Sequence, residues 1–372
     1  MAAALPFLLS VSACRNQERV VARALEKMTL REKVGQLFVI RLECLEPSIV
    51  WNETTELPQY EVRSVSKSMA ATAKEYPVGG VLLYGHNIDN PAQLKALTAS
   101  LHALRGKPLV AVDEEGGRVA RVAGNPNFGL DNVESMAALK GDPEAARRTG
   151  AYIGRYLKEY GFDIDFAPVA DVNTNPENII IGPRAFSDDP AVAAPMVAAY
   201  LQGLSQEGIT GCLKHFPGHG DTFSDTHFGY AASHKNWAQI RSCEMEPFRA
   251  GIDAGARMIM TAHIALPEVT QTDVPATLSP MILQGKLRGE LGYQGIIITD
   301  AIEMGAIRNQ YSTEEACVGT LLAGADMILC PRDLRRAVDA VVAAVEDGTI
   351  PLSRIDESVR KVLNLKYLQG RL

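Results

Sequence analysis

Gly295-Ile296-Ile297-Ile298-Thr299-Asp300 is a continuous apolar run that ends in a carboxylate. Similar short runs rich in Val, Ile and Leu recur along the chain, and stretches with helical periodicity separate them. Continuous rather than alternating apolar runs are typical of strands in a parallel sheet that helices cover. Eight such runs are present, at 36–42, 80–84, 109–113, 164–168, 210–215, 257–263, 295–300 and 326–330.

Repeated βα units that sum to eight predict an α/β fold, namely a (β/α)8 barrel of the TIM type. The 372 residues suit one large barrel or two average domains. An open doubly wound sheet would give the same alternation, but no GxGxxG follows the early runs. After the last run, apolar residues recur at helical spacing over 355–363, which predicts a closing helix. We therefore expect residues 15–372 to form one catalytic domain.

Local signals place several helix ends and one insertion. Thr29-Leu30-Arg31-Glu32 fits a capping box, so a helix should begin there. Asp142-Pro143 has the N-cap and N1 pattern, and Gly161 suits the residue just beyond a helix that ends near 160. Residues 43–75 are longer and more polar than a βα loop needs, which indicates an insertion over one rim.

Composition narrows the classes of partner. A formal net charge of −7 argues against nucleic acid or an anionic membrane surface. The six Cys are far apart without any CxxC, so neither a disulfide framework nor a tetrahedral zinc site is indicated.

The first fourteen residues form an apolar run too short to span a bilayer, and no other segment is expected to be transmembrane. The run ends in Val11-Ser12-Ala13-Cys14, which resembles a bacterial lipobox, yet no Lys or Arg precedes it. Residues 1–14 are thus either the remnant of a lipoprotein signal or a chance apolar N-terminus. Placement at a bacterial cell surface or in the cytoplasm stays open.

Ionisable residues follow the predicted strands at their carboxyl ends, whereas the opposite ends are flanked mainly by Gly and Ala. In a (β/α)8 barrel the carboxyl ends of all strands meet on one face, where the active site is built. Residues remote in sequence should therefore converge there. The strand-end residues are Asp113, Glu114, Glu115, Asp171, Lys214, His215, His263 and Asp300.

Two groups could perform acid, base or nucleophilic chemistry. Asp300, at the tip of a buried strand, could act as nucleophile or general base, or it could cap the following helix. Asp225 and His227 are one residue apart, so both side chains can project to the same side of an extended segment. The carboxylate could then support a protonated imidazole as a proton donor, unless the pair is only a surface turn.

Metal binding is a further possibility because His215, His219 and His227 lie close together in sequence. The first two predicted strands contain no His-x-His pair, and Pro217-Gly218 prevents the helical i, i+4 geometry that would bring two His to one metal. We therefore expect no metal and no cofactor.

With these segments in order along the chain, the sequence resembles the β-N-acetylglucosaminidases of glycoside hydrolase family 3. The matching segments cover nearly the whole chain: 28–37, 112–121 (Val-Asp-Glu-Glu-Gly-Gly-Arg-Val-Ala-Arg), 165–172, 181–186, 214–227 (beginning Lys-His-Phe-Pro-Gly-His-Gly-Asp-Thr) and 299–304.

This resemblance implies a retaining exo-hydrolase that removes non-reducing N-acetylglucosamine through a covalent glycosyl-enzyme. It implies Asp300 as nucleophile, His227 as acid/base and Asp225 as the partner that orients His227. It places Asp171, Glu115 and His263 in supporting roles. The residues that it implies for sugar binding are Asp113, Arg121, Arg184, Lys214 and His215.

Departures from the family pattern are few. Ala301 stands where relatives can carry Asp, and Ala185 where Ser is common. Larger relatives take their acid/base from a second domain; its expected absence here, with the Asp-x-His loop, favours N-acetylglucosaminides over glucosides. The substrate partner should be a carbohydrate from muropeptides or chito-oligosaccharides, and we expect a monomer. Phosphorolysis, a sugar-binding barrel without catalysis and a metal-dependent hydrolase remain alternatives.

Overall fold

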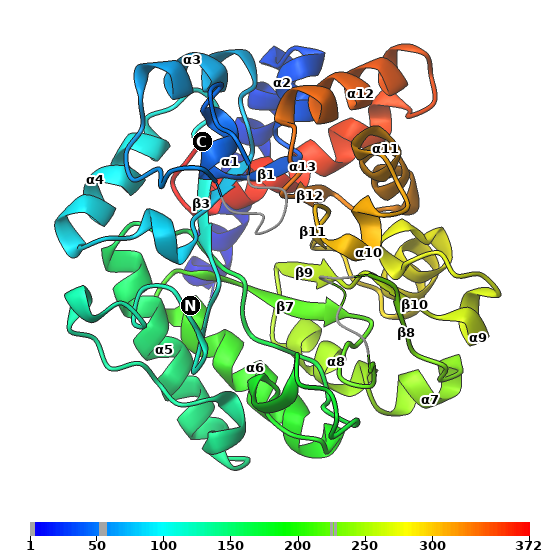
Figure 1. Cartoon of the computed structure of the whole chain (residues 1–372). Coiled ribbons are helices and arrows are strands. Elements are labelled where there is room, and N and C mark those ends of the chain that lie inside the picture. Colours follow the sequence, from blue (N-terminus) through cyan, green and yellow to red (C-terminus); the bar gives the residue numbers. More distant parts are fainter. Residues whose placement is uncertain (1–3, 52–57, 224–225, 227–228) are drawn as a thin grey trace.

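The computed structural model describes residues 4–51, 58–223, 226 and 229–372, and these residues form a closed parallel barrel with helices outside it (Figure 1). The strand order around the barrel is β1-β2-β3-β6-β7-β9-β11-β12, and β12 pairs with β1 to close it. Closure excludes the open doubly wound alternative and confirms the predicted (β/α)8 architecture.

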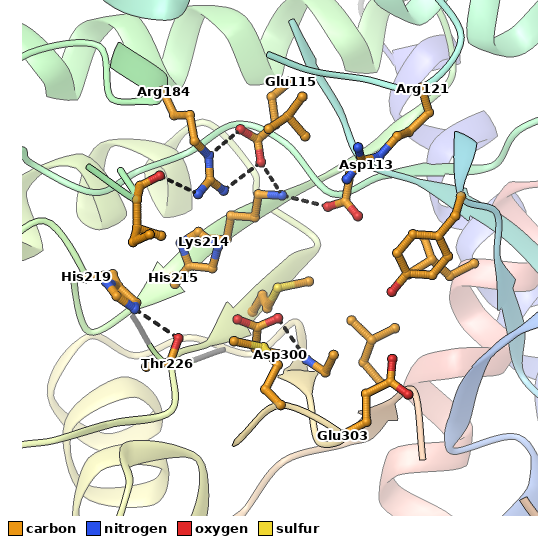
Figure 2. A pocket seen from close by; sticks show the side chains of 18 of the residues that line it. Asp113, Glu115, Arg121, Arg184, Lys214, His215, His219, Thr226, Asp300 and Glu303 are labelled. Atoms are coloured by element: carbon orange, nitrogen blue, oxygen red, sulfur yellow. Dashed lines mark hydrogen bonds and ion pairs between the residues drawn. The ribbon is translucent and has the colours of Figure 1, made fainter. Parts of the chain in front are cut away.

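All eight predicted strands are confirmed, each within the predicted run or one residue beyond it. Their carboxyl ends open toward one cavity, where polar side chains gather (Figure 2). The strands are β1 Phe38–Arg41, β2 Gly80–Leu82, β3 Leu109–Val112, β6 Ile164–Asp165, β7 Thr210–Phe216, β9 Met258–Thr261, β11 Ile296–Ala301 and β12 Met327–Leu329. Short strands β4 Glu114–Gly116, β5 Val119–Ala120, β8 Ala231–Ala232 and β10 Ile264–Ala265 form two small additional sheets.

The predicted helix ends are also confirmed. Thr29 caps α2 in a capping box, and Asp142 caps α5, which ends at Glu159 just before Tyr160 and Gly161. Gly161 has φ +84°, a conformation that glycine adopts at little cost. The larger helices are α1 Ala4–Lys27, α2 Leu30–Gly35, α3 Lys67–Glu75, α4 Pro91–His102, α5 Pro143–Glu159, α6 Pro190–Gln206, α7 Trp237–Ser242, α8 Met245–Asp253, α11 Thr313–Ala323, α12 Leu334–Glu346 and α13 Leu352–Leu368. A π-helix covers Met281–Glu290, and shorter turns include α9 Pro267–Thr270 and α10 Gly305–Arg308.

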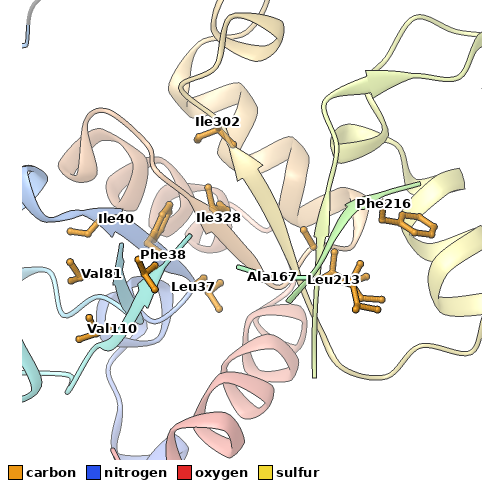
Figure 3. Packing of buried hydrophobic residues seen from close by; sticks show 14 of the residues in the cluster. Leu37, Phe38, Ile40, Val81, Val110, Ala167, Leu213, Phe216, Ile302 and Ile328 are labelled. Carbon is orange, nitrogen blue, oxygen red and sulfur yellow. The ribbon is translucent and has the colours of Figure 1, made fainter. Parts of the chain in front are cut away.

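Two apolar layers hold the barrel together. Phe38 and Ile40 point outward into the layer between strands and helices, part of which Figure 3 shows, while Val39 between them points into the barrel. The interior layer also contains Val362 and Leu365 of α13, so the predicted closing helix packs against the barrel interior. This alternation is the reason why the strands are apolar on both faces.

The segment 43–75 is only partly an insertion. Its last nine residues are α3, which is the ordinary helix between β1 and β2. The remainder follows the one-turn helix Leu42–Leu45 and carries Trp51, whose ring lies against Arg41 at the barrel rim. The predicted insertion was therefore too long by one helix.

Buried carboxylates also occur at the amino ends of two strands, where the sequence suggested mainly Gly and Ala. Asp163 precedes β6 and binds His102 at 2.8 Å and Arg371 at 3.0 Å, and Asp326 precedes β12 and binds Lys361 at 3.0 Å. Both side chains are fully buried. Because basic side chains from surrounding helices and from the C-terminal segment bind these carboxylates, the two Asp connect the strands to the helices at that end of the barrel.

Helix α1 packs against α13, and the two are seen side by side in blue and red in Figure 1. Among the residues with described placement, no helix has the length and hydropathy needed to span a membrane.

Candidate active site

A cavity of about 380 Å³ lies at the carboxyl ends of the strands. Every predicted sugar-binding residue and Asp300 line it, although they come from four different barrel strands or the segments that follow them. Asp225 and His227 lie outside the described residues, and Thr226 between them lines the cavity. The polar residues around the cavity are Arg41, Tyr84, His86, Asp113, Glu115, Arg121, Arg184, Lys214, His215, His219, Thr226, Asp300 and Glu303.

One wall of the cavity is an alternating row of cations and carboxylates (Figure 2). The Nζ atom of Lys214 lies 2.7 Å from Oδ1 of Asp113 and 2.6 Å from Oε1 of Glu115. Arg184 donates two hydrogen bonds of 2.8 Å to the same Glu115 carboxylate, from Nε and Nη2. Such a bidentate contact fixes both planar groups.

Electrostatics keep this row ionised. Burial opposes the charge on Glu115, but Lys214 and Arg184 outweigh it and lower the pKa of that carboxyl. Burial likewise opposes the charge on Lys214, and Asp113 and Glu115 nevertheless raise its pKa. Asp113 is the most exposed member, with 20% of its side chain accessible. Its carboxylate and the Lys214 ammonium can therefore offer an acceptor and donors to paired hydroxyl groups.

His215 is held rigidly beside this row. Its ring Nδ1 donates to Oδ2 of Asp171 at 2.7 Å, and its backbone N donates to Oδ1 of the same carboxylate at 3.2 Å. Asp171 is buried, which disfavours its charge, yet the adjacent His215 lowers its pKa. With Nδ1 occupied, the other ring nitrogen of His215 is the one available to a ligand.

Arg121 is positioned through the neighbouring Glu114. That buried carboxylate accepts hydrogen bonds from the backbone N of Arg121 at 2.5 Å, of Val122 at 2.9 Å and of Ala123 at 2.8 Å. The hydroxyl of Tyr156 donates to it at 2.8 Å. Glu114 thus shapes the turn that carries Arg121 to the cavity, and within the described residues the buried Arg121 Nε has no hydrogen-bond partner.

Asp300 lies across the cavity from the cation–carboxylate row (Figure 2). It belongs to β11, and the next helix, α10, begins at Gly305 with Met304 as its N-cap. The alternative that Asp300 caps the following helix is therefore wrong. Its Oδ1 accepts a hydrogen bond of 2.8 Å from the N of Ala301, whose carbonyl lies 3.0 Å from Nε2 of the buried His263.

Sequence reasoning missed a second buried ion pair at the cavity. Arg41 donates to Glu303 at 3.0 Å, and its guanidinium lies between the rings of Trp51 and Tyr84, at 4.6 and 4.7 Å from their centroids. Arg41 and Tyr84 fall at the carboxyl ends of the first two predicted strands. The strand-end rule would have found both residues had it been applied there, whereas their contact with Glu303 required the fold.

The three His weighed as metal ligands have other environments or lie outside the described residues. His215 binds Asp171, and His219 contacts two threonine hydroxyls. Among the residues whose placement is described, no group of three or more His, Cys, Asp or Glu could hold a metal ion.

The chain is similar to proteins of known class. A family model described as "Glycosyl hydrolase family 3 N terminal domain" matches residues 29–365. The chain is 39% identical over 307 residues to "Beta-hexosaminidase" of Nitrosomonas eutropha, covering 78% of this chain and 86% of that protein.

Two longer proteins are similar over part of their length. "Beta-hexosaminidase A" of Pseudoalteromonas piscicida is 34% identical over 320 residues, covering 78% of this chain but 53% of that protein. The solved structure of a family 3 beta-N-acetylglucosaminidase from Paenibacillus sp. superposes with a TM-score of 0.84 at 34% identity, covering 92% of this chain and 63% of that one. The chain thus spans between one half and two thirds of these two relatives.

Proposed function

Because the chain belongs to glycosyl hydrolase family 3, we propose that it is an exo-acting β-N-acetylglucosaminidase. Its substrates are cell-wall muropeptide fragments or chito-oligosaccharides, from which it removes the non-reducing terminal N-acetylglucosamine with retention of configuration. The names of its relatives support the class of sugar. The cavity supports the roles proposed for Asp300 and the sugar-binding residues, and the family resemblance supports those proposed for Asp225 and His227.

The observation that carries this proposal is the position of Asp300 opposite the Asp113–Lys214 pair in one cavity. A terminal sugar needs several hydroxyl partners on one side and a nucleophile at its anomeric carbon on the other. Asp113 accepts from sugar hydroxyls, Lys214, Arg184 and Arg121 donate to hydroxyls or to the acetamido carbonyl, and His215 offers its second ring nitrogen to a hydroxyl. Binding the ring in this way holds the anomeric carbon near Asp300.

In the first step a carboxylate oxygen of Asp300 attacks the anomeric carbon as the bond to the leaving oxygen breaks. His227 transfers its proton to that oxygen, and the charge of Asp225 stabilises the protonated imidazole beforehand. The products of this step are the released alcohol and a glycosyl ester on Asp300.

In the second step water attacks the same carbon and the ester bond to Asp300 breaks. The now neutral His227 takes a proton from that water, which restores both residues to their initial states. Two displacements at one carbon give net retention.

Mass spectrometry of the protein after incubation with a 2-acetamido-5-fluoro glycosyl fluoride tests the nucleophile. We expect a stable adduct on the peptide that contains Asp300, and none on the Asp300→Ala variant. An adduct on another carboxylate would overturn the assignment. Wild-type protein should also release nitrophenolate from a p-nitrophenyl N-acetylglucosaminide, and folded protein without activity between about pH 5 and 8 would favour a sugar-binding barrel.

Two further measurements separate the remaining alternatives. Identification of products with and without added phosphate distinguishes hydrolysis from phosphorolysis, since only the latter yields a sugar phosphate. A chelator should leave the rate of hydrolysis unchanged. A rate that is lost with the chelator and then restored by zinc would instead identify a metal-dependent hydrolase.

A further inference from the structure

Lys366 of α13 is one of two buried lysines among the described residues, and its partners differ from those of the other, Lys214. Lys214 is held by two carboxylates in the active-site cavity. Lys366 is 1% exposed, and its Nζ donates to two neutral acceptors, Oε1 of Gln36 and the carbonyl of Gly106 at 2.5 Å. Within the described part of the chain, no carboxylate forms an ion pair with Lys366.

The charge state of Lys366 follows from this environment. A buried ammonium without a counter-ion is costly, and such groups lose their proton instead. Burial lowers the pKa of Lys366 to about 7, with Asp163 opposing the shift and Lys107 adding to it. In the neutral amine the two hydrogens are engaged by Gln36 and Gly106. The remaining position on Nζ carries the lone pair, which makes a desolvated lysine a nucleophile.

Lys366 lines a cavity of about 290 Å³ that gives small molecules access to this amine. The exposed Arg105 and Lys107 line the same cavity, so it reaches the surface of the protein. Gln36, which also lines it, precedes β1, and Lys107 precedes β3. The cavity therefore lies at the amino ends of the strands, opposite the active site.

The ionised side chains around this cavity are mainly basic. Glu32 lines it, but Arg105 binds that carboxylate at 2.5 Å. Arg371 lines it as well and is paired with a buried Asp described above. Lys107 forms no ion pair with the described residues. A negative charge on Nζ of Lys366 would therefore be attracted by the ammonium of Lys107, whereas a positive charge there is repelled.

We propose that Lys366 is a site of reversible carbamylation by carbon dioxide. The lone pair of Nζ attacks the carbon of carbon dioxide, a carbon–nitrogen bond forms, and the electrons of one carbon–oxygen π bond move to oxygen. One proton then leaves Nζ for water, so the product is a carbamate anion. The nitrogen keeps one hydrogen and with it one of its two hydrogen bonds. Carbon dioxide is small and uncharged, so it can enter the cavity without a desolvation cost of its own.

Protonation and carbamylation compete for the same lone pair of Lys366. Carbamylation releases a proton, so its extent should rise as pH rises through about 7. At about pH 8 the neutral fraction of this amine exceeds that of an ordinary exposed lysine about 10²-fold. This difference makes the modification selective. The inference goes beyond the proposed function and does not depend on it.

Trapping with a triethyloxonium salt tests the site, because it converts a labile carbamate into a stable ethyl carbamate that mass spectrometry can locate. The full chain is incubated with isotopically labelled bicarbonate at about pH 8, trapped and digested. We expect labelled adduct on the peptide that contains Lys366, in a yield about 10²-fold above that at the exposed Lys67. The terminal amine titrates near pH 8, so the readout is the location of the label.

Three variants provide the controls. Lys366→Met should abolish the adduct on this peptide. Lys107→Met alters an exposed side chain and should reduce the adduct at Lys366 about 3- to 10-fold, because it removes the cation that favours both the neutral amine and the carbamate. Lys67→Met removes an exposed lysine remote from this cavity and should leave the adduct at Lys366 unchanged.

Absence of adduct at Lys366 in folded wild-type protein, or a yield equal to that at Lys67, would overturn the proposal. An unchanged yield in Lys107→Met would overturn the role of the neighbouring cation. Thermal unfolding verifies that each protein is folded, and the wild-type and Lys107→Met results stand even if Lys366→Met does not fold. Because trapping measures no turnover, failure of the proposed glycosidase function would alter none of these results.

Discussion

The ammonium of Lys214 lies 2.7 Å from Oδ1 of Asp113, although 101 residues separate the two in the chain. Lys214 lies near the end of β7 and Asp113 directly follows β3, and these strands are not neighbours, since β6 lies between them. The contact thus crosses one strand at the carboxyl end of the barrel. Its consequence is that the wall of cations and carboxylates in the cavity depends on barrel closure as well as on the residues themselves.

Lys214→Met should destabilise the fold by about 3–5 kcal/mol at pH 7, because it leaves the buried Glu115 with one cation instead of two. Urea unfolding measures the change. As a control, Lys95→Met breaks the exposed pair with Glu159 and should cost less than about 1 kcal/mol.

The destabilisation by Lys214→Met should depend on pH. The folded-state pKa of Glu115 is lowered, so its ionised form stabilises the wild type above its unfolded value, and this contribution is lost as pH falls through the folded value. The variant lacks part of that contribution. The gap between wild type and variant should therefore be smaller at about pH 4 than at pH 7, and a gap that grows on acidification would contradict this view.

Asp171→Asn should reduce kcat/KM by about 10- to 100-fold with little change in overall shape. An amide of the same size cannot accept all three hydrogen bonds that the carboxylate takes from the N and Nδ1 of His215 and the N of His219. Steady-state kinetics and circular dichroism test this, with the exposed Asp188→Asn as the matched control. Full activity in Asp171→Asn would show that His215 needs no such support.

Tyr156→Phe should cost about 1–3 kcal/mol of stability, because it removes a buried hydroxyl that donates to Glu114. It should also lower affinity for substrate, since Glu114 shapes the turn that carries Arg121. Unfolding and KM together measure both effects. Tyr230→Phe removes an exposed hydroxyl from Asp273 and should change stability by less than about 0.5 kcal/mol.

Lys366→Met should flatten the dependence of stability on pH between about 7 and 10. Burial lowers the folded-state pKa of Lys366 from 10.5 to about 7, so between these values the unfolded chain binds more protons. Wild-type stability should accordingly rise with pH, with a contribution of up to about 1.4 kcal/mol per unit from this residue.

The variant lacks this contribution, so its stability relative to wild type should improve as pH falls from about 10 to 7. Urea unfolding across that range measures the difference. The exposed Lys67→Met serves as the control and should follow the wild-type curve. A Lys366→Met curve that runs parallel to wild type would show that the buried amine does not titrate there.

Structural features that depend on residues close together in the chain could be predicted from the sequence. The capping box of Thr29 and Glu32 joins atoms three residues apart, and it occurs where expected. The apolar runs also marked every barrel strand. The helix α3 was not separated from the insertion before it, because its buried apolar positions, Met69 and Ala73, are too few to give a clear helical pattern.

Side-chain contacts between residues that are far apart in sequence could not be predicted in the same way. The strand-end rule brought Asp113, Lys214 and Asp300 to one face, but it gave no indication that Glu115 would lie buried between two cations. Nor did it connect Arg41 with Glu303 across the closing strands. Such pairs depend on which side chains meet in the interior, and that is set by strand order and barrel closure.

The sequence by itself determined the eight-stranded barrel and the face on which its polar residues collect, because strand periodicity and chain direction are local properties. Only the tertiary structure decided that Asp300 faces a cavity instead of capping a helix, and that Thr226, in the loop after β7, contacts Ala306 of α10. Those relationships arise when closure of the barrel brings loops after different strands within hydrogen-bonding distance, which no short stretch of the chain encodes.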